Sequence, residues 1–304
     1  MKAKSKFSGK LIVVVGPTAS GKTGVAINLA KHFKTQIISA DSRQFYKEIP
    51  IGTAAPTQSE QSEIVHHLVG NLSVTDNYNV SKFENDVLNL LDSQFTDSPY
   101  IIMTGGSGLY VNAVCEGIDV FPDIDETIRT EIQELFNKYG IEALEKKLWS
   151  LDPEYYIQVD HNNPVRLMRA IEVCLQTGHK YSELRKNDPL HRNFEIIKIG
   201  IDIPREILVG RINDRTDSMI GKGWIEEAKS VHNYKNHNSL NTVGYKELFA
   251  YFDGEMTLEQ AVEKIKTNTR RYAKRQMTWF RRDKEINWFD GNDIPGMIKL
   301  INGD

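Results

Sequence analysis

The residues with the most recognisable chemistry lie near the start of the chain, in the run Gly16-Pro17-Thr18-Ala19-Ser20-Gly21-Lys22-Thr23. This run fits the pattern G-x-x-x-x-G-K-[ST], in which backbone N–H groups and a helix N-terminus converge on phosphate oxygens. In such a loop Lys22 would neutralise a terminal phosphate, and Thr23 would offer its hydroxyl to Mg²⁺. The run therefore predicts a site for a diphosphate or triphosphate, but it does not indicate which reaction follows.

The sequence on both sides of this loop supports the prediction. Residues 11–15 (LIVVV) form a continuous apolar run, which is typical of a buried parallel strand, and residues 23–33 predict a helix. A phosphate loop requires a strand before it and a helix after it. A chance match in a Gly/Ser turn is therefore the less favoured interpretation.

A second candidate site follows the next predicted strand, residues 36–40. Asp41, Ser42, Arg43 and Gln44 come directly after that strand, at the edge where parallel sheets bind their ligands. A carboxylate at this edge could hold Mg²⁺ through water or act as a general base. Asp and Ser also favour helix N-caps, and spacing alone does not decide between a chemical and a capping role.

Two further turns contain glycine, at residues 52–56 (GTAAP) and 105–110 (GGSGLY). The second turn follows a predicted strand at residues 100–104, so its backbone could approach a ligand closely. Taken singly, each turn is most simply interpreted as a loop connection.

The elements that would position these residues are strands alternating with helices. Besides those at 11–15, 36–40 and 100–104, a strand is predicted at residues 195–202. This alternation predicts an α/β fold, namely a P-loop NTPase-like parallel sheet flanked by helices. Further helices are predicted at 205–219, 224–232 and 257–281.

The region from 122 to 190 has a different pattern, with amphipathic helices and no strand-like run. Its predicted helices cover residues 128–139, 141–148 and 165–176, and the last of them stops at Gly178. We therefore predict an α/β core at 1–121 and 191–304, with basic C-terminal helices, and a helical insertion domain at 122–190.

The bulk composition, 304 residues with 40% hydrophobic and 26% charged, is that of an ordinary soluble globular protein. No apolar run approaches the roughly 20 residues that cross a bilayer, and no secretory leader is recognised. The two cysteines, Cys115 and Cys174, are too few for a disulfide framework or a zinc ribbon. We expect a reduced, cytoplasmic protein with no membrane association.

The net charge of −3 hides a strong local asymmetry. Residues 264–284 contain nine basic residues and one acidic residue, with Arg271 and Lys274 one helical step apart. A local basic strip on an otherwise acidic chain favours contact with a polyanion such as RNA. The alternative is a solvated charged face.

Taken together, the motifs identify a family. GPTASGKT, ADSRQFY, IGTAAP, GGSGLY, NPVRLMRAIEV, VGYKE and TRRYAKRQMTWFR follow one another between Leu11 and Arg282. In this order they resemble the bacterial tRNA dimethylallyltransferase (tRNA isopentenyltransferase) family. The resemblance implies transfer of a dimethylallyl group from dimethylallyl diphosphate to the N6 amine of adenine 37, next to the tRNA anticodon, with release of diphosphate.

The resemblance also implies roles for individual residues. Residues 16–23 and Arg215 would bind the diphosphate, and the catalytic residues would be Asp41, as general base, with Lys22, Arg215 and Thr18. Ser107 stands where a threonine is usual and keeps its hydroxyl, whereas Ala55 replaces a usual lysine and puts the role of that lysine in doubt. With Arg271 and Lys274 of the basic strip, the residues expected to contact tRNA are Asp41, Ser42, Arg43, Gln44, Ser107, Arg129, Val165, Arg166, Leu167, Met168, Arg169, Thr242, Val243, Gly244, Tyr245 and Lys246.

The expected partners are the anticodon stem-loop of tRNA and dimethylallyl diphosphate, with Mg²⁺ as cofactor, and the chain is expected to be a monomer. Three other functions were weighed. A small-molecule kinase would not explain the basic strip or NPVRLMRAIEV, and an enzyme that prenylates free adenylates would need no helical insertion. A non-catalytic RNA-binding module would leave Lys22 and Asp41 without a purpose.

Overall fold

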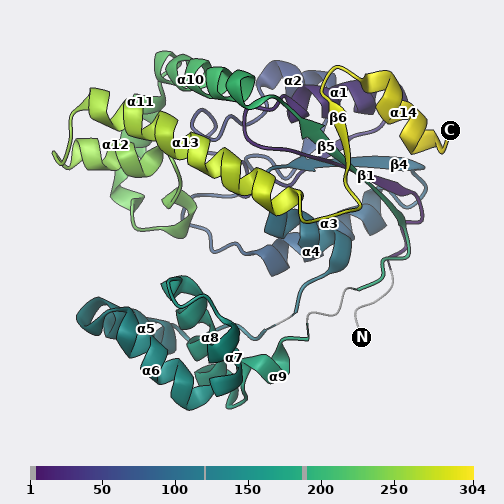
Figure 1. Cartoon of the computed structure of the whole chain (residues 1–304). Coiled ribbons are helices and arrows are strands. Elements are labelled where there is room, and N and C mark those ends of the chain that lie inside the picture. Colours follow the sequence, from purple (N-terminus) through teal and green to yellow (C-terminus); the bar gives the residue numbers. More distant parts are fainter. Residues whose placement is uncertain (1–4, 120, 187–189) are drawn as a thin grey trace. The chain divides into compact units, whose positions relative to one another are not determined.

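The computed structural model describes residues 5–119, 121–186 and 190–304 (Figure 1). The chain divides into two compact units, one formed by the residues up to Glu116 together with His191–Asp304, and the other by Gly117–Leu190. The sequence had placed the start of the insertion at 122. No helix among the described residues is long and apolar enough to cross a membrane.

The first unit is built on a six-stranded sheet in which all neighbouring strands run parallel, which confirms the predicted fold class. The strand order is β3-β2-β4-β1-β5-β6. The sequence analysis missed β3 and β6. The strands are β1 (Lys10–Val15), β2 (Ile37–Ser39), β3 (His66–His67), β4 (Tyr100–Gly105), β5 (Glu195–Asp202) and β6 (Asn287–Asp290).

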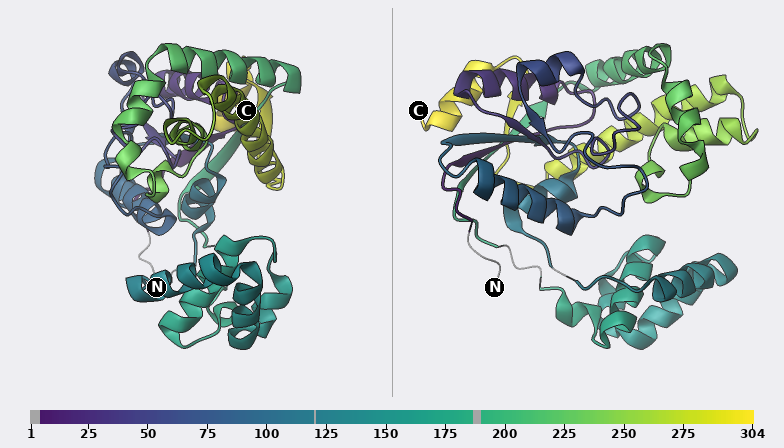
Figure 2. Two further views of the ribbon diagram at one scale, coloured as in Figure 1. Left: turned by 90° about the vertical axis from the view of Figure 1, so that its left-hand side faces the viewer. Right: turned by 180° about the vertical axis from the view of Figure 1, so that it is seen from behind.

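Helices cover both faces of this sheet (Figures 1 and 2). In β1, Leu11, Val13 and Val15 join the core on one face, and Ile12 and Val14 join the core on the other. The strand therefore reads as a continuous apolar run, because it is buried on both sides. One core includes α3 (Val80–Gln94) and α4 (Gly108–Glu116), and the other includes α1 (Lys22–Phe33) and α14 (Ile294–Asn302).

A third core lies among the helices that follow β5. Trp224, Tyr245 and Ile265 are at its centre, and each is almost completely buried. The predicted helices of this region are confirmed to within two residues, whereas α12 was missed. The helices are α10 (Arg205–Gly221), α11 (Trp224–Ser230), α12 (Tyr245–Phe252) and α13 (Leu258–Phe280). Between β2 and β3 lies the short α2 (Gln58–Glu63), which was also missed.

The sheet brings three chain segments together at the carboxyl ends of β1, β2 and β4. Val15 pairs with Gly105 across β1 and β4, and Ser39 pairs with Thr104 across β2 and β4. The loops after these strands therefore start side by side. The approach is close at Gly105, where a Cβ atom would lie 2.3 Å from the main-chain oxygen of Ala40.

The second unit is a small helical bundle with its own core. Ile132, Leu144 and Leu167 are completely buried in it, and the buried Asp152 caps α7 by accepting from Tyr155 N. The side chain of Leu167 is therefore a core residue, and its prediction as a tRNA contact is wrong. The helices are α5 (Glu126–Tyr139), α6 (Ile141–Leu151), α7 (Pro153–Gln158), α8 (Pro164–Thr177) and α9 (Tyr181–Leu184).

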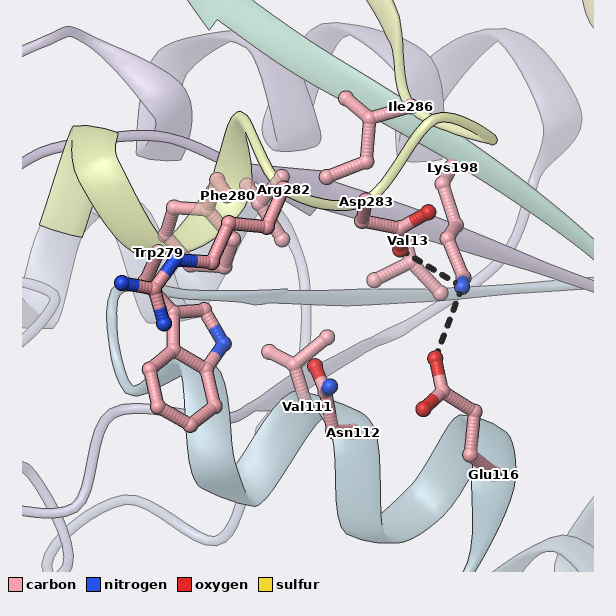
Figure 3. A pocket seen from close by; sticks show the side chains of 11 residues that line it. Val13, Val111, Asn112, Glu116, Lys198, Trp279, Phe280, Arg282, Asp283 and Ile286 are labelled. Carbon is pink, nitrogen blue, oxygen red and sulfur yellow. Dashed lines mark hydrogen bonds and ion pairs between the residues drawn. The ribbon is translucent and has the colours of Figure 1, made fainter. Parts of the chain in front are cut away.

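Two buried cations of the first unit fasten the chain where it leaves that unit and where it returns. Arg192 donates to Glu84 at 2.7 Å and to the main-chain oxygens of Ala113 and Val114, both at 2.8 Å. Lys198, with 7% of its side chain exposed, pairs with Glu116 at 3.2 Å and with Asp283 at 2.7 Å (Figure 3). It also pairs with Glu285 at 2.9 Å. Unpaired buried charge is costly, so the pairs hold these segments in one arrangement.

Gly105→Ala should destabilise the protein by about 3 kcal/mol or prevent folding. The added methyl group would clash with the main chain of Ala40, which cannot move aside as a flexible side chain could. Gly210→Ala in α10 is the matched control, since nothing lies within 4 Å of its added Cβ. Chemical denaturation measures both variants. Equal free energies of unfolding for the two would contradict the close approach of β2 and β4.

Candidate active site

A cleft of about 520 Å³ opens at the carboxyl ends of β1, β2 and β4. The structure brings together in it residues that the sequence analysis had drawn from five separate motifs. The predicted site residues that line the cleft are Thr18, Ala19, Lys22, Thr23, Asp41, Ser42, Arg43, Gln44, Arg215, Thr242, Val243 and Lys246.

The phosphate loop at one end of the cleft has the backbone shape that anion binding needs. Ala19 and Gly21 take left-handed conformations, with φ of 63° and 91°. Gly21 is the N-cap of α1 and provides no side-chain cap, so N–H groups at the helix start remain available for an anion. Gly16 is also required, because a Cβ there would lie 2.8 Å from the buried Ser20 hydroxyl.

Two half-buried cations lie against this loop. Burial lowers the pKa of Lys22 to about 8, with Asp41 raising it and Arg215 lowering it further. Burial also lowers the pKa of Arg215, whose guanidinium donates to the Thr18 hydroxyl at 3.3 Å. Two desolvated positive charges so close together favour an anionic ligand.

A third cation, Arg211, was missed by the sequence analysis. It lies four residues before Arg215 in α10 and donates to the main-chain oxygen of Ser20 at 3.4 Å. Both arginines line a smaller cavity, of about 280 Å³, beside Lys22 and Thr23. The spacing of four residues, which places two side chains on one face of a helix, was the available signal.

Asp41 lies in a turn and does not begin a helix, so the capping alternative for this residue is excluded. Its Oδ1 accepts from the backbone N–H of Arg43 at 3.2 Å. Its charge acts on Lys22, Arg215 and Tyr272, because it enters the pKa of each of them. The carboxylate therefore lies near both the phosphate loop and α13.

Ser107 connects the turn after β4 to the turn after β2. Its hydroxyl accepts from Ser42 N and donates to the Ser42 hydroxyl, both at 3.0 Å. Tyr272 of α13 hydrogen-bonds with Ser107, and burial together with the charge of Asp41 raises its pKa to about 12. The phenol therefore stays protonated beside Asp41. The sequence analysis included Tyr272 only as part of the motif TRRYAKRQMTWFR.

Arg43 and Gln44 hold loops in place. Arg43 donates to the main-chain oxygens of Asn238 and Ser239 at 2.7 and 3.0 Å, which fixes the segment before Thr242. Gln44 accepts from the Ser39 hydroxyl at 3.0 Å and donates to the Ala54 oxygen at 3.1 Å. Both side chains still line the cleft, so their contact with tRNA stays a prediction.

Glu227 fixes the turn that contains Gly52. Its carboxylate accepts from Ile51 N at 2.7 Å, Gly52 N at 2.8 Å and the Tyr245 hydroxyl at 2.5 Å. Tyr245 is completely buried, and Gly244 is buried with a φ of 98°. The prediction that the Tyr245 side chain contacts tRNA is therefore wrong, and Gly244 serves the turn before α12. No local sequence pattern marks Glu227.

Some charges of the basic strip are neutralised by ion pairs within the first unit. Lys266 pairs with Asp217 at 2.8 Å, whereas Arg271, Lys274 and Arg275 are exposed. Arg275 also lines the cleft, with its guanidinium 5.8 Å from the centre of the Tyr272 ring. The exposed part of α13 therefore begins at the cleft.

The remaining predicted tRNA contacts belong to the second unit. Val165 and Arg166 are exposed at the start of α8, and Met168 is half-buried. Arg129 of α5 pairs with Glu126 at 3.3 Å, and Arg169 lies 5.6 Å from the centre of the Phe121 ring. These side chains gather on two helices that pack together, α5 and α8.

Thr23 is the residue that fits direct contact with a magnesium ion, and Asp41 could reach such an ion through water. No group of three or more His, Cys, Asp or Glu side chains in the described part of the chain could hold a metal. Mg²⁺ usually keeps several waters and binds one or two protein groups together with substrate phosphates. The hydroxyl of Thr23 and the carboxylate of Asp41, both lining the cleft, suit an ion that arrives with a diphosphate.

The parallel sheet and its phosphate loop place this chain in the class of P-loop NTPase-like α/β proteins. Within that class it belongs to the IPP transferase family, whose family model matches residues 44–283. It is therefore a prenyltransferase.

Relatives agree over nearly the whole chain. The chain is 52% identical to tRNA dimethylallyltransferase 2 of Azobacteroides pseudotrichonymphae, over 93% of this chain and 92% of the relative. It is 50% identical to tRNA dimethylallyltransferase of Christiangramia forsetii, over 93% and 94%.

Two solved structures are similar to this chain over nearly its whole length. The tRNA isopentenylpyrophosphate transferase of Bacillus halodurans superposes with a TM-score of 0.71 at 35% identity, over 97% of this chain and 96% of that one. A eukaryotic dimethylallyltransferase, described as acting on tRNA, superposes with a TM-score of 0.75 at 26% identity, over 95% and 75%.

The lowered pKa of Lys22 predicts proton uptake on anion binding. Near pH 8, binding of inorganic diphosphate should raise this pKa and take up as much as about half a proton per site. Calorimetry in buffers of different ionisation enthalpy measures the uptake. Lys22→Arg, whose guanidinium stays charged, corrects for titration of the ligand itself. Equal uptake by both proteins would contradict the assignment.

Proposed function

We propose that this chain transfers the dimethylallyl group of dimethylallyl diphosphate to the N6 amine of adenine 37 in tRNA and releases diphosphate. One observation carries the proposal: a single cleft has the half-buried cations Lys22 and Arg215 at one end, the carboxylate of Asp41 beside them, and the exposed basic face of α13 leading away. Relatives named tRNA dimethylallyltransferase support it.

The diphosphate end of the cleft suits a leaving group. An exocyclic adenine amine is a weak nucleophile, so the allylic carbon–oxygen bond must be largely broken before nitrogen attacks. The bonding electrons then collect on the diphosphate. Lys22, Arg215 and the N–H groups at the start of α1 are already oriented toward that charge, and one such donor typically contributes about 3–4 kcal/mol.

The other side of the cleft suits the acceptor. As the amine forms its bond to carbon, it becomes acidic, and Asp41 can accept its proton. Ser42 and Ser107 hold the neighbouring turn, while Tyr272 supplies a protonated hydroxyl beside the carboxylate. Reaching the amine requires the base to leave its stack, which costs a few kcal/mol and less in a single-stranded loop.

A magnesium ion would be held by the Thr23 hydroxyl together with the diphosphate, which leaves Asp41 free to act as the base. When bound, it would neutralise part of the negative charge of the leaving group. The loop N–H groups and the two cations would orient the diphosphate in either case, since they are fixed by the protein alone.

The direct test is incubation of the purified protein with labelled dimethylallyl diphosphate and unmodified tRNA, followed by mass analysis of the nucleosides. The expected product is an adenosine heavier by one dimethylallyl group. A parallel reaction with ATP and no isoprenoid tests the kinase alternative. Consumption of ATP with unmodified tRNA would overturn the proposal.

Asp41→Asn should lower kcat by about 10²–10⁴-fold, because the amide cannot accept the proton. The dissociation constant for tRNA should stay within about twofold, since the amide keeps the shape of the turn. Single-turnover kinetics and a filter-binding assay separate the two effects. Weaker tRNA binding with normal turnover of the bound complex would show that Asp41 binds RNA and is not the base.

Neutralising Arg271 and Lys274 together should weaken tRNA binding and reduce the slope of log K against log salt by about 1–2. The matched control is Lys299→Ala, which removes an exposed charge from α14. Titrations at several salt concentrations measure the slope. A slope that matches the wild type would mean that this face of α13 is only solvated.

A further inference from the structure

Gln276 of α13 lies between two of the loops that form the cleft, although it does not line the cleft itself. It is 6% exposed. Its Oε1 accepts from the backbone N–H of Thr18 at 2.8 Å, and its Nε2 donates to the main-chain oxygen of Gly106 at 2.8 Å. One amide therefore joins the phosphate loop to the turn after β4.

The two loops that Gln276 joins serve opposite ends of the reaction. Thr18 accepts from Arg215 through its hydroxyl, so it belongs to the diphosphate end. Gly106 precedes Ser107, which hydrogen-bonds with Ser42 and so holds the turn beside Asp41. The distance between the loops sets the distance between the leaving group and the base.

The sequence leaves room for this amide. A Cβ at Gly106 would lie 2.2 Å from Nε2 of Gln276, so only glycine admits the side chain there. The oxygen and the nitrogen of the amide are both hydrogen-bonded and the side chain is buried, so the amide has one favoured orientation. Leucine has a similar size but could make neither hydrogen bond.

We propose that Gln276 is a positioning residue for the transfer reaction, which holds the phosphate loop and the Ser107 turn at the separation that transfer requires. This role rests on the proposed function. In that reaction the carbon–oxygen bond breaks with its electron pair leaving on the diphosphate, nitrogen bonds to the same carbon, and Asp41 receives the proton. All three events need aligned partners, and a misplacement of about 1 Å can cost about 10²-fold in rate.

Two substitutions separate positioning from simple folding. Gln276→Leu removes both hydrogen bonds at every pH. Gln276→Glu keeps the acceptor for Thr18, but when ionised it places a negative oxygen against the Gly106 carbonyl. Its protonated form can accept from Thr18 and donate to Gly106, which restores both bonds, and burial should raise its pKa into the measurable range.

The expected results are as follows. At about pH 8, both variants should lose roughly 10–100-fold in kcat, with the tRNA dissociation constant within about twofold of wild type. As pH falls to about 6, the ratio of Gln276→Glu to wild-type kcat should rise by about tenfold, while the ratio for Gln276→Leu stays flat. Gln94→Glu and Gln94→Leu, at an exposed position in α3, are controls with the same substitutions.

The comparison with wild type keeps this inference distinct from the proposed function. If wild-type protein transfers nothing to tRNA, the proposed function fails, and this role fails with it. If wild type transfers and Gln276→Leu matches its kcat, only the role of Gln276 fails. A flat ratio for Gln276→Glu across the pH range would also overturn it, and this holds even where Gln276→Leu does not fold.

Discussion

The placement of two half-buried cations beside one loop is the constraint on which the site depends. Lys22 and Arg215 lie against one loop, and burial lowers the pKa of Lys22 from 10.5 to about 8. The charged form of Lys22 is therefore less favoured here than in water. The phosphate loop therefore stores an unfavourable interaction that an anion relieves. The glycines, the parallel sheet and the contact of Thr18 with Arg215 keep the cations where that relief is available.

Much of the fold could be predicted because its strands are simple runs. The strands β1 and β4 are central, and burial on both faces makes them nearly continuous apolar runs. The neighbouring β5 (EIIKIGID) is interrupted by Lys198 but keeps enough apolar residues to be recognised. In contrast, β3 has two residues, His66 and His67, and β6 (NWFD) is half exposed at the sheet edge. Neither carries a period that sequence reasoning could detect. The helix α3 has an Asn79 cap and could have been found.

The site was predictable where chemistry is local in sequence and not where it depends on distant partners. The phosphate loop and Asp41 were predicted from short patterns, and the structure puts both in one cleft. Glu227 and Gln276 act on residues far away in the chain, so no local pattern marks them. The resemblance named contiguous segments as RNA contacts, but a helix turns every third or fourth side chain toward the core, which is why Leu167 and Tyr245 proved to be core residues.

Arg192 and Lys198 hold the two ends of the inserted segment in the first unit, so the segment between those ends can vary in evolution without disturbing that unit. Arg192 holds the oxygens of Ala113 and Val114, so the exit and return of the chain are tied together inside the first unit. The segment between them, Gly117–Leu190, has a hydrophobic core of its own. Such a segment is an exchangeable module: evolution or an engineer could lengthen, swap or remove it at its two ends, and the sheet that carries the chemistry would keep its internal contacts.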